Sequence, residues 1–190
     1  PEPEAPAAPE SRPLVYQVSS RELSGYVTAD QLAASASVVE GFVPKQMHAQ
    51  GDEVYVGLGE GQAQPADQLT AYRADQKVLD PENGHLLGYH VELLGRLELV
   101  QVHAESATAI VRQGNSEIEL GDRVMPHEPI PSEIAATVAP ADLRGQVAFF
   151  AKSRTQMAQE DYVILNRGSE HGVEVGSMLE VFRPGRRVPE

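Results

Sequence analysis

Histidine is the residue type here whose chemistry most readily suggests a metal site, because neutral imidazole binds zinc and other transition metals. The six are His48, His85, His90, His103, His127 and His171. No two of them have His-x-x-x-His or His-x-His spacing, and the chain has no Cys that could serve as a ligand, form a disulfide or act as a nucleophile. Since a metal site needs several ligands at fixed geometry, we interpret these histidines as structural or solvent-exposed and expect no metal or cofactor.

Carboxylates offer two further kinds of chemistry. Asp80, Glu82 and Asn83 could hold calcium, but they lack the alternating oxygen ligands and distal Glu of a calcium loop, so we assign them to a turn. Glu117 and Glu119 could act as acid and base, but no partner nucleophile is near them in sequence, which favours a solvated strand face.

The glycine-rich segment 57–61 is followed by neither a helix nor a Lys. It therefore does not have the pattern of a phosphate-binding loop. No catalytic constellation is visible in the sequence, and we predict that the chain is not an enzyme.

All of these residues except His48 lie within or between the two copies of an internal repeat. Residues 51–78 align with residues 160–188. The offset is 109 up to Gly59 and Gly168, and it becomes 110 after one extra residue in the second copy. The sequence therefore predicts two related β modules.

Each copy is predicted to be a hairpin of two short strands around a glycine turn. The first strand is 54–56 or 163–165, which are β-branched and aromatic runs of strand length. The second strand is 68–72 or 177–182. Because two strands alone bury too little apolar surface to be stable, each hairpin must belong to a larger sheet or a small barrel.

The alignment also pairs Arg73 with Arg183, each directly after an aromatic residue at the end of a predicted strand. One interpretation pairs each guanidinium with a carboxylate of the neighbouring turn. The other makes Arg73 and Arg183 partner-facing residues. The sequence leaves both interpretations open.

For the whole chain we predict a mainly β fold of two small, related β-barrel or β-sheet modules joined by a Pro-rich linker, with at most short helical turns. Residues 1–13 are expected to be a disordered Pro/Ala/Glu linker, residues 14–125 the first module, residues 126–142 the Pro-rich linker and residues 143–190 the second, shorter module. Residues 143–147 open the second module and match residues 39–43 at an offset of 104.

Local patterns predict several individual elements. Thr28 begins a weak capping box and hence a short helical turn. Residues 80–84 contain Asp-Pro and Asn-Gly and predict a hairpin turn, and Gly121 predicts another turn. Residues 89–94 and 97–103 are predicted to be separate strands on either side of Gly95.

The charge balance narrows the class of partner. The net charge is −13 and the pI is near 4.8, which argues against nucleic acid and disfavours anionic lipid. The longest apolar run, residues 147–151, is far shorter than the roughly 18 residues of a membrane span. The first residues do not have the pattern of a signal peptide, and we expect from the Pro-rich start that the chain is a fragment of a longer protein.

Several segments, taken in order, resemble a known family. They read GYVTADQL (25–32), GDEVYVGLG (51–59), LTAYR (69–73), DPENGHLLGY (80–89), VELLGRLELVQV (91–102), IELGDRVMP (118–126) and VILNRGSEHGVEVGSMLEVFRPG (163–185). Over about residues 25–185 the chain resembles the region that follows a LysM domain in periplasmic bacterial proteins. It is similar to the type IV pilus secretin-associated proteins, whose C-terminal part is related to the C-terminal domain of flagellar assembly protein T.

The resemblance implies a non-enzymatic scaffold of the cell envelope, in the periplasm and associated with the outer membrane or cell wall. Its expected partners are an outer-membrane secretin or other envelope proteins, contacted through sheet edges or loops. Peptidoglycan would be bound by a LysM domain that this chain does not contain. The alternatives are a glycan-binding module and, third, an envelope enzyme with a site between the two modules.

Overall fold

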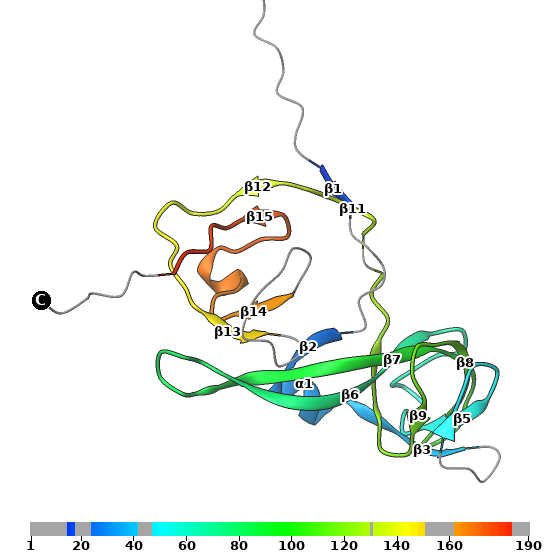
Figure 1. Ribbon diagram of the computed structural model, residues 1–190. Helices are drawn as coiled ribbons and strands as arrows, with labels where there is room; N and C mark the ends of the chain where they lie inside the picture. Colours follow the sequence, from blue (N-terminus) through cyan, green and yellow to red (C-terminus); the bar gives the residue numbers. More distant parts are fainter. Residues whose placement is uncertain (1–14, 18–23, 42–46, 130, 151–161, 184–190) are drawn as a thin grey trace, which may run out of the picture. The chain divides into compact units, whose positions relative to one another are not determined.

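The structure is a computed structural model that describes residues 15–17, 24–41, 47–129, 131–150 and 162–183 (Figure 1). The chain divides into two compact units. Unit 1 comprises residues 1–20, 130–144 and 167–190, and unit 2 comprises residues 21–129 and 145–166. Strands dominate the described residues, with one short α-helix and one 3-10 turn, so the predicted mainly β fold is confirmed.

The composition of the two units differs from the modules expected from sequence. Residues 15–17 group with the C-terminal segments, and residues 145–166 group with the larger unit 2. The second copy of the repeat is thus divided, because residue 166 ends one segment of unit 2 and residue 167 begins one of unit 1. The predicted linker 1–13 lies outside the described residues.

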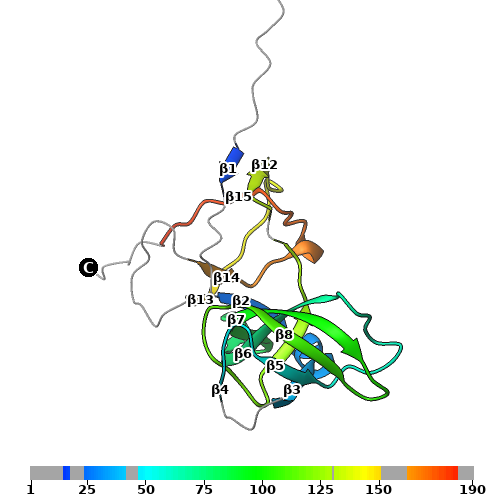
Figure 2. The same cartoon turned by 90° about the vertical axis from the view of Figure 1, so that its right-hand side faces the viewer.

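Unit 2 is built on a seven-stranded antiparallel sheet. In order across the sheet, its strands are β2 (Ser24–Thr28), β7 (Leu86–Val102), β6 (Gln68–Leu79), β10 (Arg123–Pro126), β3 (Ala36–Gly41), β5 (Glu53–Val56) and β8 (Ala107–Gly114). Because β7 also pairs with β8, the sheet closes on itself into a small six-stranded barrel, with β2 added outside the ring (Figure 2). Closure removes the unpaired edges that these strands would otherwise present.

The β6–β7 hairpin reaches well beyond the barrel (Figure 1). Its tip is the predicted turn, in which Gly84 has a φ of 75°. The Asp80 carboxylate accepts hydrogen bonds from the Glu82 backbone N–H at 2.9 Å and from the Asn83 side-chain amide at 3.0 Å. This part of the chain therefore follows local turn chemistry, as expected.

The predicted break at Gly95 is wrong, because residues 89–94 and most of 97–103 belong to the single 17-residue strand β7. A Cβ at Gly95 would lie 2.2 Å from the backbone oxygen of Gln113 on β8. Glycine at this position therefore permits the close approach of β8, which closes the barrel, and does not mark a turn.

Short elements complete unit 2. Helix α1 (Ala29–Ala34) begins with the predicted capping box, in which Thr28 and Gln31 exchange hydrogen bonds. β4 (Met47–His48) pairs with β9 (Ile118–Glu119), and the turn after β9 contains Gly121 with a φ of 92°. None of the helices among the described residues is long and apolar enough to cross a membrane.

The core of unit 2 is aliphatic. Its main cluster consists of buried residues from the barrel strands and β9: Val38, Val54, Val56, Leu69, Ala71, Leu94, Leu97, Leu99, Ala107, Ala109, Val111, Ile118 and Val124. A second cluster joins Val27, Tyr72 and Val91 where β2, β6 and β7 meet. Alternating side chains of β6 and β7 thus fill the barrel, which is the main source of stability in such a fold.

Two further strands belong to unit 2. β13 (Val147–Phe150) pairs antiparallel with β14 (Val163–Leu165). The Phe149 ring stacks on the His90 ring of β7 with centroids 4.9 Å apart, and the Asn166 side-chain amide donates to the Asp80 carboxylate at 2.9 Å. Both Asp80 and Asn166 are buried, so this hydrogen bond ties the strand pair to the tip of the hairpin.

Unit 1 contains two small sheets. β1 (Val15–Gln17) pairs antiparallel with β11 (Glu133–Ala135), and β12 (Thr137–Val138) pairs parallel with β15 (Ser177–Met178). A 3-10 turn, Ser169–His171, precedes β15. β11 and β12 lie within the predicted Pro-rich linker, which therefore contains strands. None of residues 15, 131–144 and 167–183 of unit 1 is buried, in contrast to unit 2.

The close approach at Gly95 leads to a stability prediction. Gly95→Ala should lower the free energy of unfolding by about 1–3 kcal/mol, because the new methyl group meets backbone that cannot move without opening the β7–β8 pairing. Urea denaturation of the two proteins measures this difference.

Gly57→Ala is the matched control for Gly95→Ala. The nearest atom to a Cβ at Gly57 is 3.6 Å away, on the Val39 side chain, and the substitution should change the free energy by no more than about 0.5 kcal/mol. Equal effects of the two substitutions would contradict the proposed role of Gly95.

Candidate functional site: the repeat loop and the strand that follows it

The internal repeat is visible in the strand pairing. Three residue pairs of β3 and β5 recur in β13 and β14 with each residue number raised by 109. In the first copy the pairs are Val38 with Val56, Glu40 with Tyr55 and Gly41 with Val54. In the second copy they are Val147 with Leu165, Phe149 with Ile164 and Phe150 with Val163. The register irregularity also falls at the same place in both copies. The repeat therefore includes the preceding strand, and the predicted match of residues 143–147 with 39–43 at an offset of 104 is wrong.

The predicted hairpin within each copy is also wrong. In the first copy β5 lies between β3 and β8, whereas β6 lies between β7 and β10. In the second copy β14 pairs with β13, and β15 pairs with β12. The segment between the two strands, residues 57–67 or 166–176 (the repeat loop), therefore connects strands that are not paired with each other.

The first part of the repeat loop has the same hydrogen bonds in both copies. The Gly59 N–H donates to the Gln62 side-chain oxygen at 3.0 Å, and the Gln62 N–H donates to the Gly59 carbonyl at 3.1 Å. In the second copy the Gly168 N–H lies 3.4 Å from His171 Nδ1, and the His171 N–H donates to the Gly168 carbonyl at 2.9 Å. His171 thus takes the structural place of a glutamine.

The end of the repeat loop is also the same in both copies. The Gln64 N–H donates to the Asp67 carboxylate at 2.8 Å, and the Glu174 N–H donates to the Ser177 hydroxyl at 3.0 Å. In both copies the residue just before this acceptor has a positive φ, 74° at Ala66 and 94° at Gly176. The loop is therefore one folding motif used twice, and side chains of different types make its equivalent bonds.

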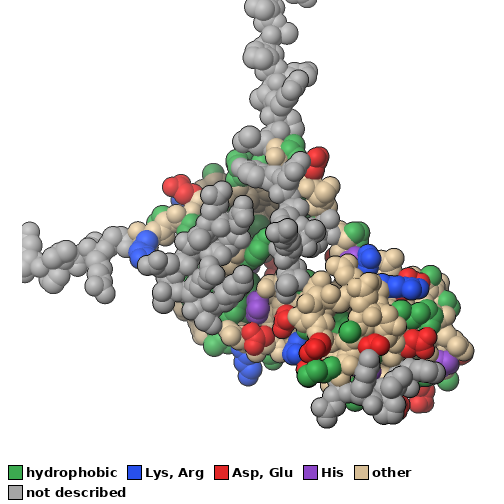
Figure 3. All heavy atoms as spheres, turned by 45° about the vertical axis from the view of Figure 1, so that its right-hand side comes forward, with side chains coloured by type: hydrophobic (Ala, Val, Ile, Leu, Met, Phe, Trp, Pro, Cys, Tyr) green, Lys and Arg blue, Asp and Glu red, His purple; other side chains and the backbone are tan. Residues whose placement is uncertain are grey.

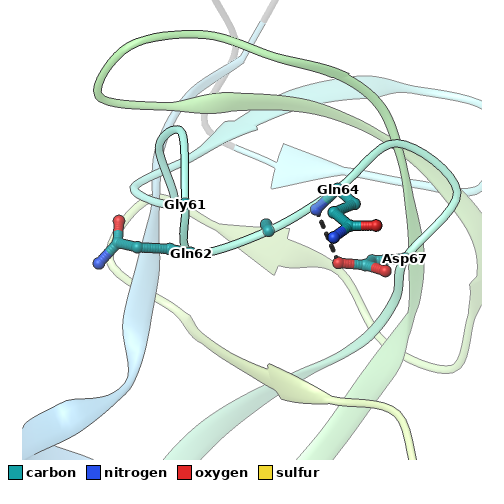
Figure 4. Close-up of a pocket in the computed structure, with 5 residues that line it drawn as sticks. Gly61, Gln62, Gln64 and Asp67 are labelled. Carbon is teal, nitrogen blue, oxygen red and sulfur yellow. Dashed lines mark hydrogen bonds between the residues drawn. The ribbon is translucent and has the colours of Figure 1, made fainter.

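A hollow of about 380 Å³ lies against the first repeat loop (Figure 4). Gly61, Gln62, Ala63, Gln64 and Asp67 line it. Asp67 supplies the only charged side chain of these five, and its carboxylate already accepts from the Gln64 N–H, as Figure 4 shows. All five lining residues belong to the repeat loop, and Gly61 is also part of the glycine-rich segment 57–61. The fold of the loop therefore accounts for the hollow.

The two copies differ in the strand that follows the loop. In the first copy Leu69 and Tyr72 of β6 are 5% and 1% exposed, because Leu69 packs in the main core cluster and Tyr72 packs in the second cluster. In the second copy β15 ends at Met178, and the residues at the equivalent positions, Leu179 and Phe182, are 42% and 71% exposed. Of the predicted strand 177–182, only the first two residues are in a strand.

Arg73 does not end a strand but lies within β6. Its guanidinium donates two hydrogen bonds to the Asp122 carboxylate, at 2.8 and 2.7 Å, and lies 3.5 Å from the Glu119 carboxylate. Asp122 is buried and also accepts from the Glu119 N–H at 2.7 Å. The hydrogen bond with Asp122 raises the pKa of Arg73 above its ordinary value. For Arg73 the carboxylate partner is therefore inside the chain.

Arg183 has a different environment. It lies beyond the last described strand, is exposed, and forms no ion pair with any described residue. By contrast, Arg112 pairs with Glu98 at 3.0 Å, a contact that lowers the pKa of Glu98. Figure 3 shows the same interspersion of acidic and basic side chains on the face in view. Arg183 is thus the aligned arginine that an external partner could reach.

The remaining candidate residues have structural surroundings. His103 and His127 lie 3.0 Å from the hydroxyls of Thr108 and Thr70, respectively, and His48 is buried against Gly41. His85 and His171 are exposed. Among the described residues, no three His, Cys, Asp or Glu side chains come together as a metal site would require. Glu117 is exposed and its carbonyl accepts from Arg73 at 3.4 Å.

Sequence reasoning overlooked two polar residues that organise these contacts. Neither Asp122 nor Asn166 is among the residues to which the sequence assigns a role. A signal existed for each: Asp122 follows a turn glycine, and Asn166 takes the position of Gly57 in the repeat. The backbone hydrogen bond is indeed repeated there, from Gly57 to Ser37 and from Asn166 to Gln146.

Comparison with known proteins adds no family assignment. Neither protein-family models nor curated proteins match the chain. The candidate site therefore rests on the comparison of the two copies within this chain, which identifies the exposed segment (residues 179–183) as the surface where they differ most.

The Arg73–Asp122 contact leads to the second prediction. Asp122→Ala should lower the free energy of unfolding by about 2 kcal/mol, because it removes the two-point contact with Arg73 and leaves the Glu119 N–H without its acceptor. Chemical denaturation measures the loss.

Glu119→Ala is the control, because it removes only the longer, half-exposed ion pair with Arg73. It should cost less than about 1 kcal/mol. If Glu119→Ala proves as costly as Asp122→Ala, the buried carboxylate is not the anchor of Arg73.

Proposed function

We propose that this chain is a non-enzymatic scaffold of the bacterial cell envelope, located in the periplasm, that binds an outer-membrane secretin or another envelope protein. The family resemblance of residues 25–185 supports this proposal. In that family a LysM domain binds peptidoglycan, and the proposal assigns attachment to the wall to such a domain, outside this chain. The pilus secretin is the partner that the resemblance favours.

The observation that carries the proposal is the exposed segment of the second copy. Leu179, Val181 and Phe182 are 42%, 59% and 71% exposed, although the same pattern is buried in the first copy. A row of large apolar side chains on a segment that belongs to no described sheet is the kind of surface that binds another protein. An extended partner strand can pair with such a segment through backbone hydrogen bonds.

The isolation of this segment within unit 1 supports a role in assembly. None of residues 15, 131–144 and 167–183 of unit 1 is buried, and the described strands of the unit form only two-stranded sheets. Such sheets are marginal in water unless further strands or a helix cover them. A partner strand would supply that cover, which couples binding to the stability of the unit.

Glycan binding is the alternative, and the exposed ring of Phe182 favours it over catalysis, because aromatic faces stack on apolar faces of sugars. A pull-down on purified sacculi with this chain alone tests it. Recovery of the chain with the sacculi would support glycan binding by the β part, whereas the scaffold proposal expects no recovery.

Photocrosslinking in the native envelope tests the scaffold proposal. A photoreactive residue at Val181 in the full-length protein should crosslink to an outer-membrane secretin, identified by mass spectrometry. The same residue at Leu120, which is 51% exposed in unit 2, is the control and should give no such product. Products from Val181 that contain only wall-linked lipoproteins, or no product, would overturn the secretin assignment.

A further inference from the structure

We infer that the exposed segment (residues 179–183) binds an antiparallel partner strand that begins with a carboxylate and continues with an apolar residue two positions later. This inference rests on the proposed scaffold function and specifies the chemistry of its partner. The evidence comes from the first copy of the repeat, where the equivalent segment, residues 69–73, already has such a strand beside it.

In the first copy, that neighbouring strand is β10. It pairs antiparallel with β6, so that Val124 lies opposite Ala71 and Arg123 lies opposite Tyr72. Val124 is 2% exposed and belongs to the main core cluster. The offset of 110 takes Ala71 to Val181 and therefore predicts an apolar partner residue opposite Val181.

The positive charge of Arg183 predicts which residue type begins the partner strand. Asp122 comes directly before β10 and holds Arg73 by two hydrogen bonds. Arg73 becomes Arg183 in the second copy, but Arg183 is exposed and has no carboxylate among the described residues. A carboxylate two residues before the apolar residue would meet Arg183 as Asp122 meets Arg73, a two-point contact that is stronger than a neutral hydrogen bond.

The overall charge restricts the partner further. With a net charge of −13, the chain as a whole repels strongly acidic peptides. The expected strand is therefore apolar, with a single carboxylate directed at Arg183. Side chains of the partner would cover part of Leu179 and Phe182, as Val124 of β10 shares a core cluster with Leu69 and Met125 of β10 packs against the cluster of Tyr72.

A second copy of the chain is the other conceivable occupant. The strand of a second copy that has these same residues, β10, is paired on both sides within the closed barrel by β6 and β3. Opening the barrel would expose its core. A different protein with a free strand edge fits the segment better.

The chain supplies its own probe for this proposal. A fluorescent peptide with the sequence LGDRVMPH, residues 120–127, contains β10 and has Asp122 as its single acidic side chain. Fluorescence anisotropy should show that it binds the full chain. Changing Asp122 to Ala in the peptide, or Arg183→Ala in the chain, should each weaken binding about tenfold. Both changes together should weaken it no more than either alone, because they remove the same contact.

Two further variants locate the binding surface. Val181→Asp places a charge in the middle of the exposed segment and should abolish measurable binding. Val175→Asp is the matched control, because Val175 is 76% exposed in the neighbouring loop, and it should bind as the unchanged chain does. Since both positions are exposed, neither substitution should unfold the protein.

The proposal is overturned if the peptide does not bind, if binding survives Val181→Asp, or if the Asp122 and Arg183 changes act independently. Sedimentation that shows a dimer lost on Val181→Asp would make a second copy the occupant and would also overturn it. The proposed function is judged separately: crosslinks from Val181 to a secretin would uphold it even if the peptide fails. Peptide binding without such crosslinks would leave the strand chemistry intact and refute the secretin partner.

Discussion

The pairing of β7 with both β6 and β8 is the contact on which unit 2 depends. β7 is long enough to pair with β2 and β6 along its first half and with β6 and β8 along its second. It also contributes Leu94, Leu97 and Leu99 to the core. A closed ring of strands satisfies its own backbone groups and encloses its apolar side chains, so one strand both completes the hydrogen bonding and seals the core.

This constraint explains why one sequence pattern has two outcomes. The repeat loop folds alike in both copies because its bonds are local, from Gly59 to Gln62 and from Gln64 to Asp67 in the first copy. The strand that follows has no local means of burying its side chains. In unit 2 its side chains pack in the two core clusters, whereas in unit 1 no described strand pairs with residues 179–183. The repeated motif thus has a buried second strand in one setting and an exposed second segment in the other.

Buried polar contacts hold the strands in register. Asp122 joins Arg73 of β6 to the turn before β10, and Asp80 joins the hairpin tip to Asn166. Each carboxylate accepts several hydrogen bonds, which offsets the cost of removing it from water. These contacts are specific in direction, so they select one arrangement where apolar packing alone would tolerate several.

The sequence by itself determined the features that depend on neighbouring residues. These include the mainly β character, the capping box at Thr28, the turns at Gly84 and Gly121, and the presence of a repeat. Such features arise from backbone preferences and hydrogen bonds within a few residues, which a sequence pattern records directly.

Only the tertiary structure decided which strands pair, and hence which side chains are buried. Strand order depends on contacts between residues far apart in sequence, so the expected hairpins were wrong, and Gly95 could not be recognised as a point of close approach to β8. The same holds for the two aligned arginines. Their sequence surroundings are alike, but Arg73 meets Asp122 from a distant turn, while Arg183 lies exposed with no described carboxylate beside it.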